Sequence, residues 1–346
     1  MAKTIIIGNQ KGGTGKTTTT VNLSAALAEA GKRVLIVDVD PQGNATSGVG
    51  INKSELDKSV YDLLVSNVQA KEIIVQTDFD NLSIVPCNIN LTGAEIELVG
   101  VISRESRLKK ALEPVQDDYD YIIIDSPPSL GLITLNALVA SDSIIVPIQC
   151  EFYALEGVSQ LVNTLNLVKE SLNPDLYIEG VLMTMADFRT NLTSEVINEI
   201  KQYFEDEAYN TVIPRNIRLS EAPSHGKPIT EYDTNSIGAK KYRALAQEVI
   251  NGREYCKELA LKELDNKDHK DDILNEIIND KIEQKGEPVR ESIVAADDVD
   301  STEDIIMDEV KFVEAVDPVE PVEAVEAVEI DIKKDIKNQP ESTNVQ

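Results

Sequence analysis

The residues best suited to chemistry form a glycine-rich stretch near the start of the chain. It reads KGGTGKTT over residues 11–18 and follows an apolar segment, Thr4–Gly8. Glycines let backbone N–H groups turn inward around a phosphate without a side-chain clash, and a helix N-terminus adds further donors. We therefore expect Lys16 to reach the β- and γ-phosphates of a nucleotide and the Thr17 hydroxyl to bind Mg²⁺.

This loop departs from the common phosphate-binding pattern at one position. The pattern G-x-x-x-x-G-K-[ST], aligned on Gly15 and Lys16, requires glycine where this chain has Gln10. An additional lysine, Lys11, instead stands ahead of two glycines. The apolar strand before the loop and the helical pattern after it still indicate a nucleotide-phosphate site.

Acidic residues follow two other apolar segments. Asp125 ends the segment that begins at Tyr121, where a carboxylate can hold Mg²⁺ through water. Asp38 and Asp40 are two positions apart after another such segment, and residues i and i+2 share a face of a strand. Because a Pro-Gln-Gly-Asn turn follows, we expect Asp40 to orient the attacking water, while Asp38 is open to a functional or a structural role.

Strands and helices alternate over residues 1–250. Continuous apolar strands separated by helices predict a doubly wound α/β fold, with a mostly parallel sheet covered on both faces. The predicted strands are Thr4–Gly8, Val34–Val37, Leu82–Cys87, Tyr121–Asp125, Ser143–Pro147, Ile178–Met183 and Thr211–Ile213. The longer predicted helices are Thr17–Ala30, Ala154–Leu172, Ser194–Phe204 and Ala239–Ile250. Such sheets bind ligands at the carboxyl ends of their strands, where the motifs fall.

The composition limits the classes of protein that fit. The 346 residues include 61 acidic and 33 basic ones, for a net charge of -28. Residues 254–346 hold 28 acidic and 11 basic residues and residues 1–253 the other 33 and 22, which leaves net charges of -17 and -11. Any contact with nucleic acid therefore requires a local basic patch. No apolar run reaches about 18 residues, and the first is too short for a signal peptide.

Three scattered cysteines, Cys87, Cys150 and Cys256, argue against a disulfide framework and a zinc site, so we expect a cytoplasmic protein. We expect one nucleotide-binding domain over residues 1–252 and an acidic helical extension over 253–285. The low-complexity acidic tail over 286–346, with FVEAVDPVEPVEAVEAVEI near its middle, is expected to be disordered. The tail either solvates the chain or docks a partner.

The motifs together resemble a known family. Residues 11–18 are similar to the deviant Walker A loop of the ParA/MinD family of partitioning and positioning ATPases, which are P-loop NTPases. The stretches 37–48 (VDVDPQGNATSG), 124–131 (IDSPPSLG) and 212–228 (VIPRNIRLSEAPSHGKP) resemble the chromosomal Soj-like ParA subgroup. The resemblance covers residues 1–252.

The resemblance implies ATP and Mg²⁺ as cofactors and an ATP-dependent sandwich homodimer. In that arrangement Lys11 reaches the phosphates of the partner subunit and Gly12 lies at the dimer interface. The implied catalytic residues are Lys11, Lys16, Asp40 and Asp125, with Thr17 and Asp125 (through water) on the metal. The implied nucleotide contacts are Lys11, Gly12, Gly13, Thr14, Gly15, Lys16, Thr17, Thr18 and the adenine-contacting Pro214 and Asn216.

The resemblance also implies non-specific DNA binding by the ATP-bound dimer, through Arg189 and Arg218. Hydrolysis would be slow unless a ParB-like centromere-binding protein stimulated it, and the protein would be associated with the nucleoid. Whether the replicon is a chromosome or a plasmid stays open. Further basic residues are weaker candidates for an extended patch: Lys201, Arg215, Lys240, Lys241 and Arg243. If the acidic tail competes for this face, DNA binding should depend on the tail.

Three alternatives are weighed against this function. A MinD-like, membrane-associated positioning ATPase would carry a basic amphipathic C-terminal helix. The acidic C-terminal region here would be repelled by anionic lipid, so no membrane partner is expected. A metabolic enzyme of this fold class, either a nitrogenase iron-protein relative or a small-substrate synthetase, lacks its matched cysteines or a substrate motif. A specific transcriptional regulator would need a helix-turn-helix domain ahead of the first strand, which we expect to begin at Thr4.

Overall fold

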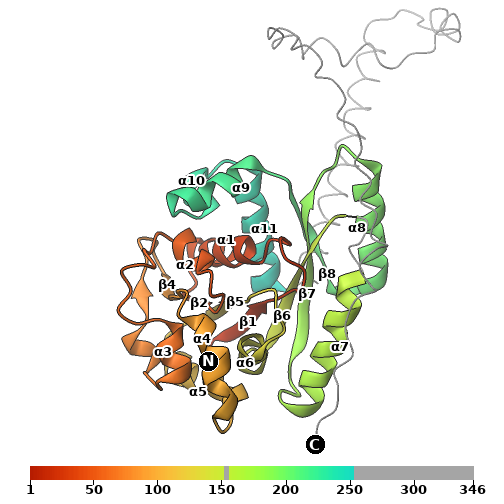
Figure 1. The fold of residues 1–346 in the computed structure, drawn as a ribbon. Helices are drawn as coiled ribbons and strands as arrows, with labels where there is room; N and C mark the ends of the chain where they lie inside the picture. The colour runs from red at the N-terminus through yellow and green to blue at the C-terminus, as the bar shows by residue number, and fades with distance from the viewer. Residues whose placement is uncertain (152–155, 253–346) are drawn as a thin grey trace, which may run out of the picture. The chain divides into compact units, whose positions relative to one another are not determined.

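The computed structural model describes residues 1–151 and 156–252. Within these residues the strands form one eight-stranded sheet in the order β3-β4-β2-β5-β1-β6-β7-β8 (Figure 1). The strands are β1 Lys3–Ile7, β2 Val34–Asp38, β3 Val75–Gln76, β4 Leu82–Val85, β5 Tyr121–Asp125, β6 Ser143–Gln149, β7 Tyr177–Ala186 and β8 Ala208–Pro214. The short edge strand β3 pairs with β4 antiparallel, and the other pairs are parallel.

Helices connect the strands and cover both faces of the sheet (Figure 1). The α-helices are α1 Lys16–Glu29, α2 Asn44–Gly48, α3 Val60–Val65, α4 Leu91–Glu97, α5 Arg107–Leu112, α6 Leu132–Ala140, α7 Glu156–Ser171, α8 Asn191–Phe204, α9 Ile217–Glu221, α10 Ile229–Tyr232 and α11 Ile237–Asn251. Short 3₁₀ turns lie at Ala70–Glu72, Leu98–Gly100, Arg104–Ser106, Glu113–Val115, Glu205–Glu207 and Ala222–His225.

Two apolar cores explain this three-layer arrangement. On one face α1 packs against α11, with Leu23 and Leu27 in the same cluster as Tyr242 and Leu245. The other face is covered by α3 to α8, and α8 contributes a stripe at helical spacing, Val196, Ile200 and Phe204. Because both faces are covered, the central strands read as continuous apolar runs rather than alternating ones.

The doubly wound, mostly parallel fold predicted from the sequence is confirmed. The seven predicted strands correspond to β1, β2 and β4 to β8, and the helix predicted at Thr17–Ala30 is α1. The two-residue strand β3 and the short helices were not predicted, because their patterns are too brief to show a period. The predictions for residues 253–285 and 286–346, and for Cys256, lie outside the described residues.

The register of the central strands decides what lies at the carboxyl edge of the sheet. Asp125 of β5 lies opposite Ile7 of β1 on one side and opposite Asp38 of β2 on the other. The loop that follows β1 therefore starts beside both carboxylates. In the described part of the chain, no helix is both long and apolar enough to cross a membrane.

One close contact between neighbouring strands can be tested by substitution. A Cβ added at Gly180 of β7 would lie 2.3 Å from the ring of the buried Tyr209 in β8. We expect Gly180→Ala to lower the free energy of unfolding by about 1–3 kcal/mol, since overpacking a core costs this much. Gly100→Ala is the matched control, because its Cβ would meet no atom within 4 Å. Equal unfolding midpoints in urea would contradict the packing argument.

Candidate nucleotide site

The loop between β1 and α1 is built around two glycines in the left-handed region. Gly13 has φ 75° and Gly15 has φ 87°, a conformation that side chains rarely adopt. Gly15 is also the N-cap of α1. The Thr184 hydroxyl of β7 donates to the carbonyl oxygen of Thr14 at 2.9 Å and so holds the loop from a strand two positions away from β1 in the sheet. Thr184 was not identified from the sequence, since 170 residues separate the two partners.

Lys16 points across this loop rather than into solvent. The residue is 7% exposed, and its Nζ donates to the carbonyl oxygen of Lys11 at 3.1 Å. Burial lowers the pKa of the ammonium, and the nearby charges of Asp125 and Asp40 act in the opposite direction. A cation that burial has stripped of water gains more from a phosphate than an exposed one does.

Asp125 joins the end of β5 to the first turns of α1. Its carboxylate is fully buried and accepts hydrogen bonds from the Thr17 hydroxyl at 2.8 Å and the Thr20 hydroxyl at 2.9 Å. Burial raises the pKa of Asp125 well above its usual range, and the charge of Asp38 raises it further. Thr20 was missed by the sequence analysis, although its position three residues after Thr17 places both hydroxyls on one helix face.

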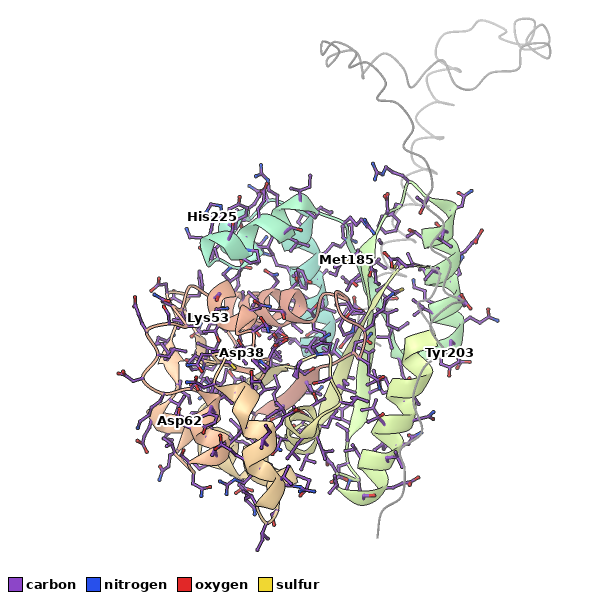
Figure 2. The ribbon with its side chains drawn as sticks, viewed as in Figure 1. Asp38, Lys53, Asp62, Met185, Tyr203 and His225 are labelled. Atoms are coloured by element: carbon purple, nitrogen blue, oxygen red, sulfur yellow. The ribbon has the colours of Figure 1, made fainter. Side chains whose placement is uncertain are left out.

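Asp38 and Asp40 have different surroundings. Asp38, labelled in Figure 2, is fully buried. Its Oδ2 accepts the backbone N–H of Thr46 at 2.8 Å and the Thr46 hydroxyl at 2.7 Å. Burial raises the pKa of Asp38 to about 6, against the effect of these hydrogen bonds. The Thr46 hydroxyl also accepts the backbone N–H of Cys87 at 2.9 Å. These contacts favour the structural role for Asp38, which anchors α2 to the end of β2, while Thr46 also contacts the segment that follows β4.

Asp40 instead borders an open cleft with the glycine-rich loop. It is 9% exposed, and its Oδ1 accepts the backbone N–H of Gln42 at 2.9 Å. The cleft has a volume of about 620 Å³. Its lining comes from the loop and α1, the turn after β2 and the start of α2, helix α4, the loop after β5, and β7: Gly12, Gly13, Gly15, Lys16, Thr17, Thr18, Asp40, Pro41, Gln42, Asn44, Thr92, Pro127, Pro128 and Met185.

A second hollow of about 880 Å³ shares Gly15, Thr18 and Met185 with this cleft. It is also lined by Pro214 and Asn216, the two residues expected to contact adenine. The structure therefore places these residues in a hollow that continues from the phosphate loop. Met185, near the end of β7 (Figure 2), has φ 52°, which is uncommon for a residue other than glycine.

The two residues expected at a dimer interface are accessible. A Cβ at Gly12 would meet nothing within 4 Å. The Lys11 side chain is 41% exposed, and its Nζ lies 3.7 Å from a Glu151 carboxylate oxygen. Glu151 also pairs with Arg215 at 3.4 Å. Lys11 thus contacts an acid of its own chain, at the rim of the nucleotide cleft.

Arg189 and Arg218, the candidate DNA contacts, both lie at the carboxyl edge of the sheet. Arg189 follows β7, and Arg218 lies in α9, directly after the adjacent β8. Each guanidinium is exposed, and each contacts a carboxylate, Asp187 at 2.7 Å and Glu221 at 2.9 Å. Among the weaker candidates, Arg215 pairs with Glu151 as above, and Arg243 pairs with Glu29 at 2.7 Å.

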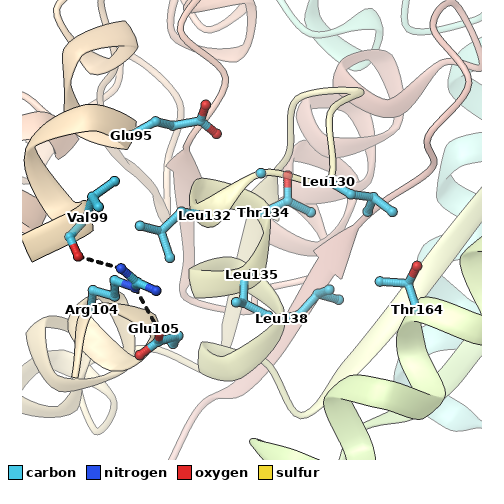
Figure 3. A pocket seen from close by; sticks show the side chains of 11 residues that line it. Glu95, Val99, Arg104, Glu105, Leu130, Leu132, Thr134, Leu135, Leu138 and Thr164 are labelled. Atoms are coloured by element: carbon cyan, nitrogen blue, oxygen red, sulfur yellow. Dashed lines mark hydrogen bonds and ion pairs between the residues drawn. The ribbon is translucent and has the colours of Figure 1, made fainter. Parts of the chain in front are cut away.

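A separate hollow of about 500 Å³ lies between α4 and α6 (Figure 3). Figure 3 shows Arg104 bonded to the Val99 carbonyl oxygen and to Glu105, whose carboxylate lies 3.0 Å from Nε. Leucines of α6, including Leu135, form its apolar wall. None of the predicted site residues lines this hollow.

Comparison with known proteins agrees with this geometry. An AAA domain family model matches residues 2–178. The sporulation initiation inhibitor protein Soj of Bacillus subtilis is 64% identical over 249 residues, which cover 72% of this chain and 98% of Soj. The chromosome partitioning protein ParA of Myxococcus xanthus is 52% identical over 250 residues, with 72% of this chain and 88% of ParA covered.

A solved structure shares the fold of the described domain. It is titled cobyrinic acid a,c-diamide synthase from Mycobacterium smegmatis, with bound ATP analog and magnesium. It is 38% identical, with a TM-score of 0.64, and the match covers 72% of this chain and 95% of the synthase. The loop, the family model and the two close relatives agree: this chain belongs to the ParA/MinD family of deviant Walker A ATPases, within its Soj/ParA subgroup.

Proposed function

We propose that this chain is an ATP-dependent DNA-segregation ATPase. The observation that carries the proposal is the joint placement of Lys16, Thr17 and Asp125 around the loop, with Asp40 on the opposite wall of the same cleft. The Myxococcus relative, named as a chromosome partitioning protein, supports the segregation role. The Bacillus relative supports the assignment to the same subgroup. In this function an ATP-bound homodimer binds DNA without sequence preference and releases it after hydrolysis.

ATP would bind with its phosphates in the cleft and its base in the adjoining hollow. Backbone N–H groups of the loop and the N-terminus of α1 face the phosphates, and Lys16 exchanges its contact with the Lys11 carbonyl for a phosphate oxygen. Pro214 and Asn216 border the base. The solved synthase with an ATP analog and magnesium supports this choice of nucleotide for the shared fold.

The residues beside the loop suit a magnesium ion. Asp125 is a buried carboxylate in direct contact with the Thr17 hydroxyl, and hard oxygen donors of this kind, together with phosphates, are what Mg²⁺ prefers. Bound there, Mg²⁺ would neutralise charge developing on the phosphate oxygens. Thr17 would hold the ion directly and Asp125 through water. Asp40 would accept a hydrogen bond from the attacking water and orient it toward the γ-phosphate.

Dimerisation and partners complete the proposal. Lys11 would leave Glu151 and contact the phosphates bound by the partner subunit, with Gly12 at the contact between the two copies. Arg189 and Arg218 would contact DNA phosphates, which places the protein on the nucleoid. A ParB-like centromere-binding protein would stimulate hydrolysis, because the cleft offers a single acid suited to positioning water.

The phosphate-loop assignment is tested by Lys16→Ala. We expect ATP affinity to fall about 100-fold, because a buried charge-assisted hydrogen bond to phosphate is lost. Titration of a fluorescent ATP analogue measures the affinity. Lys110→Ala, an exposed lysine of α5, is the control and should bind ATP normally. Undiminished affinity in the Lys16 variant would overturn the assignment.

The role of Asp40 is tested by Asp40→Ala. We expect an ATP-bound dimer that persists while turnover falls about 100-fold or more, since positioning the nucleophile contributes this much. Sedimentation with ATP, together with phosphate release, measures both quantities. Asp57→Ala, at an exposed position in the loop before α3, should leave both unchanged. A variant that turns ATP over normally would refute the assignment.

DNA binding separates the proposed function from its alternatives. We expect the chain to bind unrelated duplexes with ATP, and not with ADP or without nucleotide. Arg189→Ala and Arg218→Ala should each weaken binding about threefold and reduce the salt slope by less than the ~0.9 of an unpaired cation, because each guanidinium contacts a carboxylate of this chain. Arg33→Ala, at the amino end of β2, is the control.

A dimer that binds no DNA in any nucleotide state would contradict the proposed DNA-segregation function. Binding to anionic vesicles would then favour a membrane-associated positioning ATPase. ATP-dependent amidation of a small acid would favour the chemistry named for the solved synthase.

A further inference from the structure

The arginines at the carboxyl edge of the sheet are not free cations. Asp187 accepts Nε of Arg189 at 2.8 Å and Nη2 at 2.7 Å, so two donors of one guanidinium edge are engaged. Arg218 contacts Glu221 at 2.9 Å and Asp233 at 3.5 Å. Each cationic group expected to meet DNA therefore already has an acid of this chain as its partner.

The Asp187 carboxylate is held in place by its own turn. The Asp187 side chain is 26% exposed, against 88% for Arg189, so the acid is sheltered and the guanidinium projects into solvent. The same Oδ1 also accepts the backbone N–H of Arg189 at 3.2 Å. The backbone carbonyl of Asp187 accepts the hydroxyl of Thr190, the N-cap of α8. The competing acid is thus fixed in position by the backbone at the start of α8.

The Glu221 carboxylate is fixed in a comparable way. Its Oε2 accepts the Tyr232 hydroxyl of α10 at 3.1 Å as well as Nη1 of Arg218 at 2.9 Å. The backbone N–H of Arg218 donates to the Asn216 side chain, which caps α9. Both ion pairs are therefore parts of ordered turns and not chance contacts between long side chains.

We propose that Asp187 and Glu221 are built-in competitors of DNA phosphate for Arg189 and Arg218, which keep the affinity for DNA low. This inference rests on the proposed function. A paired guanidinium adds little net positive charge, so it attracts phosphate weakly and contributes little to counterion release. Exposed ion pairs of this kind are weak, so a phosphate can displace the carboxylate.

The acids stay charged under ordinary conditions. Arg189 lowers the pKa of Asp187 to about 2, so protonation does not remove the competitor near neutral pH. The competition is therefore a constant feature of the surface. Low affinity suits a protein that must leave DNA when its nucleotide is hydrolysed, because release then has a smaller barrier.

The test uses the full chain with ATP and Mg²⁺ and a duplex of arbitrary sequence, over a series of salt concentrations. We expect Asp187→Asn and Glu221→Gln each to tighten binding about threefold to tenfold. Asp187→Asn should also steepen the salt dependence by up to about 0.9 in the log–log slope, since one more cation becomes available to phosphate. Glu221→Gln should steepen it by a smaller amount, because Asp233 still contacts Arg218. The slope is the deciding readout, because a carboxylate that only holds a turn would not raise it when replaced.

Asp175→Asn is the matched control. It removes the same charge at an exposed site before β7, whereas Asp187 follows that strand, and the ten residues of β7 span about 30 Å. ATP affinity and ATP-dependent dimerisation are measured for every variant, because Asp187 lines the hollow expected to hold the base. DNA affinities are compared at equal dimer occupancy.

Unchanged or weakened binding with an unaltered slope in both variants would overturn the inference and leave the proposed function standing. An equal gain in the Asp175 variant would also overturn it, since net charge alone would then explain the effect. If the unsubstituted chain and all variants fail to bind DNA with ATP, both the inference and the proposed function fall.

Discussion

The hydrogen bonds of the buried Asp125 with Thr17 and Thr20 determine the arrangement of the whole site. They join the end of the central strand β5 to the first two turns of α1. The loop between β1 and α1 must then close over a short distance, and it does so with Gly13 and Gly15 in the left-handed region. Lys16 is directed across the loop as a consequence. An apolar residue in place of Asp125 would remove the partner of the buried Thr20 hydroxyl and of the half-buried Thr17 hydroxyl, which is costly for the buried group.

The central strands and the long helices could be predicted because their patterns are local. Val34–Val37 and Ile122–Ile124 are buried on both faces, so they read as continuous apolar runs. The loop residues were found for the same reason, since all of them fall within residues 11–18. Thr184 and Thr46 could not be found. Their contacts, to Thr14, Asp38 and Cys87, join segments that are distant in sequence or lie in different elements, and a lone threonine carries no periodic signal.

The net charge of the domain can be counted from the sequence, but the partner of each arginine can be seen only in the structure. The net charge predicts that any contact of this domain with nucleic acid requires a local basic patch. It gives no information on pairing, yet Arg189, Arg215, Arg218 and Arg243 each contact a carboxylate. An acidic chain offers each arginine many acids nearby. Which acid it meets depends on turns such as the one that starts at Asp187, and those turns depend on where β7 and β8 end.

Asp38, the last residue of β2, and Asp40, which follows the strand, differ in how far their contacts are fixed. Asp38 is saturated by the backbone and hydroxyl of Thr46, which in turn accepts a hydrogen bond from Cys87. These contacts do not involve the phosphate loop, so they need not change when a ligand enters. The contacts of Lys16 with Lys11 and of Thr17 with Asp125 are different. In the proposed function the Lys16 ammonium would bind a phosphate and the Thr17 hydroxyl oxygen would bind the metal ion. Asp40, by contrast with Asp38, borders the cleft beside the glycine-rich loop, and its carboxylate accepts the backbone N–H of Gln42.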